Sequence, residues 1–81
     1  MSEERNINYK VLEKIAVIGV IGDHITTELR LVEYGDYKPK LDLRRWRVKD
    51  DNEIPLKGLT LDIDEAKALN QALTDYLGAE R

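Results

Sequence analysis

The pattern of apolar and polar positions predicts four strands followed by one helix. Residues 9–22 are rich in Val and Ile without a helical period, which is typical of a strand. The second half of this stretch, Ile15 to Ile21, is apolar at nearly every position, which implies cover on both faces. Glu13 and Lys14 interrupt the alternation, so a bulge or a bend is expected there.

The next two segments alternate between apolar and polar positions, as half-buried strands do. Ile25 to Tyr34 is the first, and its row with Leu29 and Leu31 is expected to face the core. The second is the stretch KPKLDLRRWRVK, residues 38–49, in which Leu41 and Leu43 are expected to face the same core. If neighbouring strands pair as a meander, the opposite face of the sheet carries Arg30, Tyr34, Arg44 and Trp46 together. The alternation fails past Leu43, because Arg45 and Arg47 fall on the core row. The strand either bulges there or extends beyond the core.

The remainder of the chain predicts a loop, a short strand and a helix. Residues 49–55 are polar and are expected to form a loop, and residues 56–61 a short strand. Apolar residues then recur at helical spacing over residues 63–77. Asp62 is a favourable N-cap, Glu65 completes a capping box three residues later, and Gly78 is a typical helix stop.

These elements define an α+β fold, a four-stranded antiparallel sheet followed by one C-terminal helix. Its single domain is expected to span residues 7–78, with tails at residues 1–6 and 79–81. One helix can cover one face of such a sheet, but it cannot also cover both faces of Ile15 to Ile21. The surplus apolar surface therefore predicts self-association into a homodimer.

Composition narrows the class of protein. The chain has 81 residues, enough for one domain, and no cysteine, which rules out disulfides and thiolate metal sites. Its first residues, MSEERN, carry no apolar signal region, and no apolar run approaches the ~20 residues that span a bilayer. We therefore expect a cytoplasmic protein without a membrane partner, with nucleoid association as an open alternative.

Catalytic and metal-binding patterns are weak in this sequence. The one histidine, His24, lies beside a turn, and no nucleophile and base suggest themselves as a pair. Asp50, Asp51 and Glu53 lack the spacing of a calcium loop, and no phosphate-binding glycine motif is present. We expect neither an enzyme nor a cofactor, metal or small-molecule substrate.

Basic and aromatic residues provide the clearest functional signal. The whole chain is acidic, with 13 Lys and Arg against 16 Asp and Glu, but residues 38–49 hold six basic residues and one acid, a local charge of +5. They also hold Trp46, the only tryptophan. Proteins bind single-stranded nucleic acid with a positive groove for phosphates and with aromatic rings on which bases stack. The alternative is that Trp46 packs in the core and the charges only protect a sheet edge from aggregation.

Three segments resemble the positive-cofactor-four family of single-stranded-DNA-binding transcriptional coactivators, in particular its small bacterial YdbC-like branch. They are DLRRW at residues 42–46, KGLTL at residues 57–61 and the preceding TELRLVEYGDYKP, and the likeness extends over residues 9–77. It implies a homodimer with strongly curved sheets that form grooves for single-stranded DNA. The chain lacks the Ser- and Lys-rich tail of eukaryotic members, and its residues 49–55 are acidic.

Carried across by position, Arg44, Trp46 and Lys57 match the family's binding residues best. Lys38 and Lys40 lie where the family has basic residues entering the third strand, whereas Arg30 and Tyr34 come from strand parity alone. We therefore expect binding of single-stranded DNA with little sequence preference, in transcription, replication or repair. Two alternatives stay open: RNA binding, and a protein-interaction module that uses the sheet edge and the dimer surface.

Overall fold

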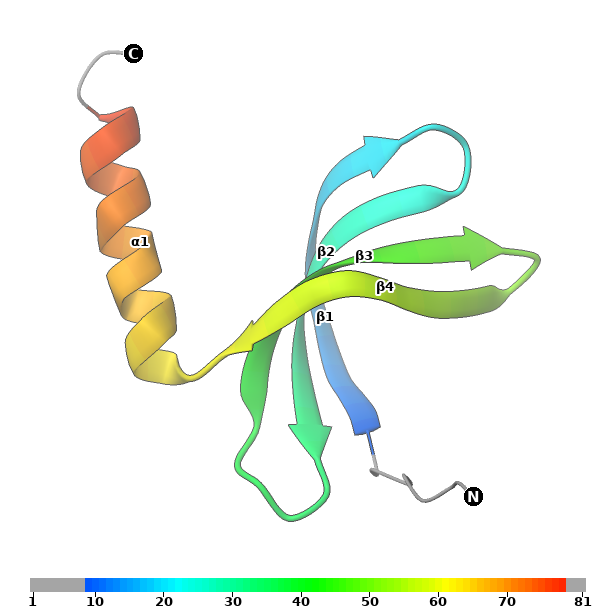
Figure 1. Ribbon diagram of the computed structural model, residues 1–81, viewed down its shortest axis with the longest axis horizontal. Coiled ribbons are helices and arrows are strands. Elements are labelled where there is room, and N and C mark those ends of the chain that lie inside the picture. The colour runs from blue at the N-terminus through cyan, green and yellow to red at the C-terminus, as the bar shows by residue number, and fades with distance from the viewer. Residues whose placement is uncertain (1–8, 79–81) are drawn as a thin grey trace.

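A computed structural model describes residues 9–78 of the chain. Four strands, β1 (Tyr9–Ile21), β2 (Ile25–Tyr34), β3 (Lys40–Lys49) and β4 (Asn52–Leu61), precede one helix, α1 (Ile63–Leu77). The strands pair antiparallel in the order β1-β2-β3-β4, a simple meander (Figure 1). The predicted α+β fold and element order are confirmed, whereas the tails expected at residues 1–6 and 79–81 lie outside the described residues.

Left-handed backbone conformations close the hairpins. Gly22 and Gly35 have φ values of 65° and 54° in the first two turns. The third turn uses Asp50 and Asp51, whose φ values are 51° and 68°. Asp tolerates this region better than most residues because its short side chain bonds locally, so two residues suffice for the turn. The prediction of a loop over residues 49–55 is therefore wrong, since β4 begins at Asn52.

The sheet is curled as well as twisted. β1 shifts register against β2 at three places, and two of these shifts flank Glu13 and Lys14, which confirms the irregularity expected there. β4 shifts register once against β3. Such bulges bend a strand and increase its twist. In a flat sheet the outer strands β1 and β4 would lie about 14 Å apart, three strand spacings. Here Lys14 of β1 and Glu53 of β4 form an ion pair of 2.6 Å, so the two edges approach each other across one face.

This enclosed face is the inner face of the sheet. It contains the buried residues, and they are mostly polar. The residues with less than a tenth of their surface exposed are Glu28, Arg30, Val32, Asp42 and Trp46. All lie in the row of β2 and β3 that was expected to face solvent. The expected core row, with Leu29, Leu31, Leu41 and Leu43, forms the outer face and is only partly covered. The prediction failed because curvature decides which face a sheet encloses, and hydrophobicity along one strand does not report curvature.

Helix α1 begins and ends where the sequence predicts. The Asp62 side chain accepts a hydrogen bond from the Glu65 backbone N–H, Glu65 returns one from the Asp62 N–H, and Gly78 caps the other end. The helix nevertheless stands beside the sheet (Figure 1), and none of its residues is buried. The radius of gyration is 14.7 Å, against about 12 Å for a compact chain of this length. The expected covering of one sheet face by α1 is therefore not seen in the single chain.

Candidate nucleic-acid interface

Three aromatic rings gather on the inner face. The ring centroids of Tyr9 and Tyr34 are 5.0 Å apart, and those of Tyr9 and Trp46 are 6.5 Å apart. The first pair sits directly across β1 and β2 in the register, whereas Trp46 comes from β3. Sheet curvature is what brings Tyr9 to Trp46, because β2 lies between their strands.

Arg30 covers the face of Trp46. Its guanidinium carbon lies 3.7 Å from the ring centroid, a cation–π contact. Nε and Nη2 donate to Glu28 at 2.8 Å and 2.6 Å, and Nη1 donates to Glu53 at 3.1 Å. Only 1% of Arg30 and 3% of Trp46 is exposed. The stacked pair is therefore an interior element of the free protein, and the ring of Trp46 is not open to a base in this conformation.

Arg44 is held by a neighbour on its own strand. Its Nε and Nη2 donate to the two carboxylate oxygens of Asp42 at 2.8 Å and 2.9 Å, and Nη1 donates to the carbonyl of Leu56 at 2.8 Å. The hydrogen bond with Asp42 raises the pKa of Arg44 further above its ordinary value, so its charge is permanent. Gly58 lies opposite Arg44, and a Cβ at Gly58 would clash with the Arg44 Cβ. Only glycine fits there, which gives a local reason for the KG sequence at residues 57–58.

The structure brings four of the seven predicted site residues together: Arg30, Tyr34, Arg44 and Trp46 share the inner face. Lys40 begins β3 and is half-buried, while Lys38 and Lys57 are exposed. Within residues 9–78, none of these three lysines takes part in an ion pair. Arg30 and Arg44 are thus already paired with acids, whereas these three lysines are available to an anion without rearrangement.

Sequence reasoning missed the acids and the lysine that complete the inner face. Glu28 and Glu53 bind Arg30, and Lys14 binds Glu53 from β1. Glu28 has the same parity as Arg30 on β2, so its position could have been read from the alternation. The place of Lys14 and Glu53 depends on curvature between the two outer strands, for which the alternation gives no signal.

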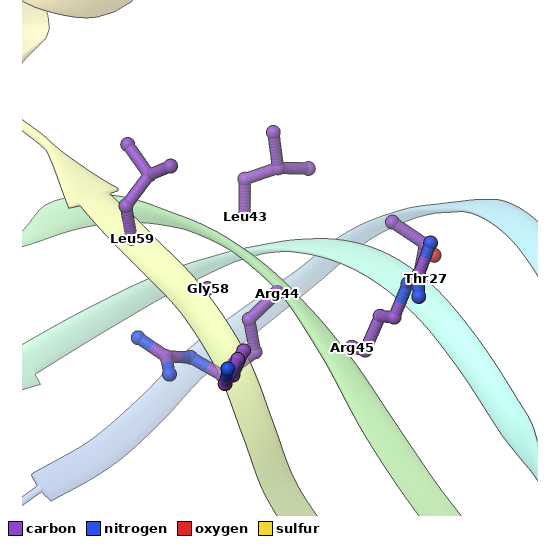
Figure 2. A pocket seen from close by; sticks show the side chains of 7 residues that line it. Thr27, Leu43, Arg44, Arg45, Gly58 and Leu59 are labelled. Atoms are coloured by element: carbon purple, nitrogen blue, oxygen red, sulfur yellow. The ribbon is translucent and has the colours of Figure 1, made fainter.

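The Arg45 side chain projects from the outer face, away from the side chain of Arg44 (Figure 2). Figure 2 shows it beside Thr27, at the edge of a shallow hollow of about 440 Å³. The hollow lies where β4 bulges against β3, and no acidic residue lines it. Its lining residues are Thr27, Leu43, Arg44, Arg45, Lys57, Gly58 and Leu59. The sequence left the direction of Arg45 and Arg47 open. Strand parity now places both on the outer face with Leu43, and both are exposed.

The phenol of Tyr9 should make the fold sensitive to alkaline pH. Burial, together with the nearby Asp42 carboxylate, raises the pKa of Tyr9 to about 12, from 10.0. The folded state therefore holds this proton more tightly than the unfolded chain does. The resulting stability is complete below pH 10 and is lost as the pH rises toward 12. Burial also raises the pKa of Tyr34, which adds to the same loss.

Tyr9→Phe isolates this contribution, because the Tyr9 hydroxyl is buried without a hydrogen-bond partner in the described part of the chain. We expect the variant to match the wild-type protein in stability at pH 7 and to lose less stability between pH 10 and 12. Urea unfolding of both proteins at pH 7, 10 and 12 measures this. Equal losses in the two proteins would contradict the assignment to Tyr9.

Comparisons with known proteins add no assignment: no protein-family model matches the chain, and a search of curated proteins finds no match. Over residues 9–78, no cluster of three or more His, Cys, Asp or Glu side chains could hold a metal ion. None of the helices in that range is both long and apolar enough to cross a membrane.

Proposed function

We propose that this protein binds single-stranded nucleic acid, with DNA as its principal ligand, and acts as a homodimer. The observation that supports this most directly is the state of the basic stretch at residues 38–49. Arg44 is the only one of its six basic residues that forms an ion pair within residues 9–78. An acidic chain that leaves five cations unpaired on and beside one strand carries a surface suited to phosphates.

Binding would combine phosphate neutralisation with base stacking. Lys38, Lys40 and Lys57 offer charge without first breaking an ion pair. Tyr37, 74% exposed in the β2–β3 turn, and the half-buried Tyr34 offer rings at the end of the sheet where Lys38 and Lys40 lie. Trp46 supports Arg30 in the free protein and is not open to a base, so the tyrosines supply the stacking surface and Trp46 reports a strand bound beside Arg30. Binding through phosphates and base stacking should give weak sequence preference, as suits a protein that holds unpaired strands in transcription, replication or repair.

The proposal of a homodimer is supported by apolar surface that the single chain leaves uncovered. Leu69, Leu73, Tyr76 and Leu77 of α1 are between 38% and 64% exposed, and Leu59 of the outer face is 52% exposed. A helix without tertiary packing is marginal in water at this length. A second copy that covers α1 and the outer leucines would supply the packing that both elements lack, and it would leave the inner face free for nucleic acid.

Titration with a short oligo-dT tests the proposed function. We expect saturable quenching of Trp46 fluorescence together with a rise in the anisotropy of a labelled strand. Affinity should fall with salt by about 0.7 log units per phosphate contact per log unit of salt. Duplex DNA of the same length should bind more weakly, because its bases are stacked inside. An oligo-U strand in parallel compares RNA with DNA. No change in either signal at low salt would refute single-strand binding.

A protein-interaction module is the second candidate, and the exposed outer-face leucines and α1 favour it. In this case Trp46 is an interior residue, and the partner docks on the apolar surface instead of the basic stretch. The response to salt separates the two functions. Docking through apolar surface should change little between low and moderate salt, whereas strand binding should weaken steeply.

A further inference from the structure

Two cations of the inner face share one carboxylate. Lys14 of β1 lies directly across from Arg30 of β2 in the strand register. Glu53 reaches both from β4: its Oε2 accepts from Lys14 Nζ at 2.6 Å, and its Oε1 accepts from Arg30 Nη1 at 3.1 Å. One anion with two oxygens thus bridges an ammonium and a guanidinium. The two non-bridging oxygens of a phosphodiester could make the same pair of contacts.

Arg30 is held in place without help from Glu53. Glu28 accepts from Nε and Nη2 of Arg30, and the Thr26 hydroxyl donates to the other Glu28 oxygen at 2.6 Å. Trp46 supports the flat face of the guanidinium. These contacts fix the plane and two nitrogens of the guanidinium, so Nη1 is the edge that remains for an anion arriving from outside.

Glu53 is the exchangeable partner. A third of its side chain is exposed, against 6% for Glu28, and the side chain of Lys14 is 57% exposed. If Glu53 is displaced, water can solvate its carboxylate, whereas release of Glu28 would leave a buried charge without its partner. The hydrogen bond from Lys14, together with Arg30, holds the pKa of Glu53 below its ordinary value. Glu53 is therefore an anion at neutral pH.

We propose that Lys14 and Arg30 form a phosphodiester-binding subsite that Glu53 occupies in the free protein. The proposal rests on the proposed single-strand binding and deepens it. A phosphate of the strand takes the place of the Glu53 carboxylate, which moves into solvent. With Glu53 in place, the two cations are balanced by two acids, Glu28 and Glu53. Without it, the group carries one net positive charge, so Glu53 sets how strongly this part of the face attracts a strand.

Glu53→Gln tests the subsite, with Asp50→Asn as its matched control. Both substitutions remove one negative charge from the β3–β4 hairpin, but Asp50 forms no ion pair within the described residues, and Asn readily adopts its φ of 51°. By anisotropy at low salt, we expect Glu53→Gln to bind oligo-dT about three to ten times more tightly than the wild-type protein, an effect in the range of single ion pairs. The control should stay within about twofold, as expected for a screened exposed charge.

A double-mutant cycle with Lys14→Gln separates occupation of the subsite from general charge. If Glu53 acts by occupying Lys14 and Arg30, its removal should gain clearly less in the Lys14→Gln background. The same gain in both backgrounds, or an equal gain from Asp50→Asn, overturns the subsite while leaving strand binding intact. If the wild-type protein and Glu53→Gln both fail to bind oligo-dT and oligo-U, single-strand binding itself is refuted, and the subsite with it.

Discussion

Trp46→Ala should lower the free energy of unfolding by about 3–5 kcal/mol, the usual cost of truncating a buried aromatic residue. Trp46 is 3% exposed, carries Arg30 on its face and lies near Tyr9. Its removal opens a cavity and also withdraws the surface that supports a buried guanidinium. Since small domains are stable by only about 5–15 kcal/mol, the variant should be largely unfolded at modest urea concentrations. Urea unfolding followed by far-UV circular dichroism measures this, because the variant has no tryptophan to report.

Trp46→Phe provides the control for this result. Phenylalanine keeps an aromatic face under Arg30 and removes an indole N–H that is buried without a partner within residues 9–78. We expect a cost of about 1–2 kcal/mol for the smaller ring, clearly below that of alanine. A loss of less than about 1 kcal/mol in Trp46→Ala would show that the ring is not part of the interior in solution. It would also restore Trp46 as an open stacking surface.

Leu73→Glu should convert the proposed dimer to monomers. In the single chain Leu73 is 48% exposed, so a protein that remained monomeric would tolerate the change with little loss. At a dimer interface, the same substitution would place a charge against apolar surface. We expect the dimer dissociation constant to rise by at least about 30-fold, the equivalent of a 2 kcal/mol hot spot. Sedimentation velocity over a concentration series measures the dissociation constant, and circular dichroism should report loss of helix in the monomer.

Ala68→Glu is the matched control on the same helix. Five positions from Leu73, it projects from roughly the opposite side of α1 and is exposed. This variant should sediment as the wild-type protein does. A wild-type chain that is monomeric at all concentrations, or a Leu73→Glu variant that is as dimeric as wild type, would contradict the homodimer. The milder Leu73→Ala, for which burial predicts a loss of about 2–5 kcal/mol, would then cost almost nothing.

Much of the architecture could be predicted from local patterns. Asp62, Glu65 and Gly78 bound the helix because capping depends on residues three or four apart in sequence. The strands alternate clearly enough that the sequence alone predicts Arg30, Tyr34, Arg44 and Trp46 on one face. One exception is the turn at Asp50 and Asp51, where two residues connect β3 to β4 although the sequence predicts a seven-residue loop. Non-glycine residues in the left-handed region are uncommon, so this pattern does not predict them.

The candidate site was predicted only in part, and the difference lies in what surrounds each residue. Arg30 and Trp46 were expected to be surface groups that hold a strand. In the structure they stack on each other and are almost fully covered, with Glu28 and Glu53 as the partners of the arginine. Alternation assigns a residue to a face of a strand, but it does not tell whether that face is open or enclosed.

By itself, the sequence determined the order ββββα, the limits of the helix, the residues that share a face and the concentration of positive charge on one strand. These properties depend on neighbours within a few positions or on strict alternation. Only the tertiary structure decided that the polar row is the enclosed one, that Lys14, Arg30 and Glu53 meet, and that α1 is left without cover. Each of these depends on how far the bulged outer strands curl toward each other, and that curvature is a property of the whole sheet.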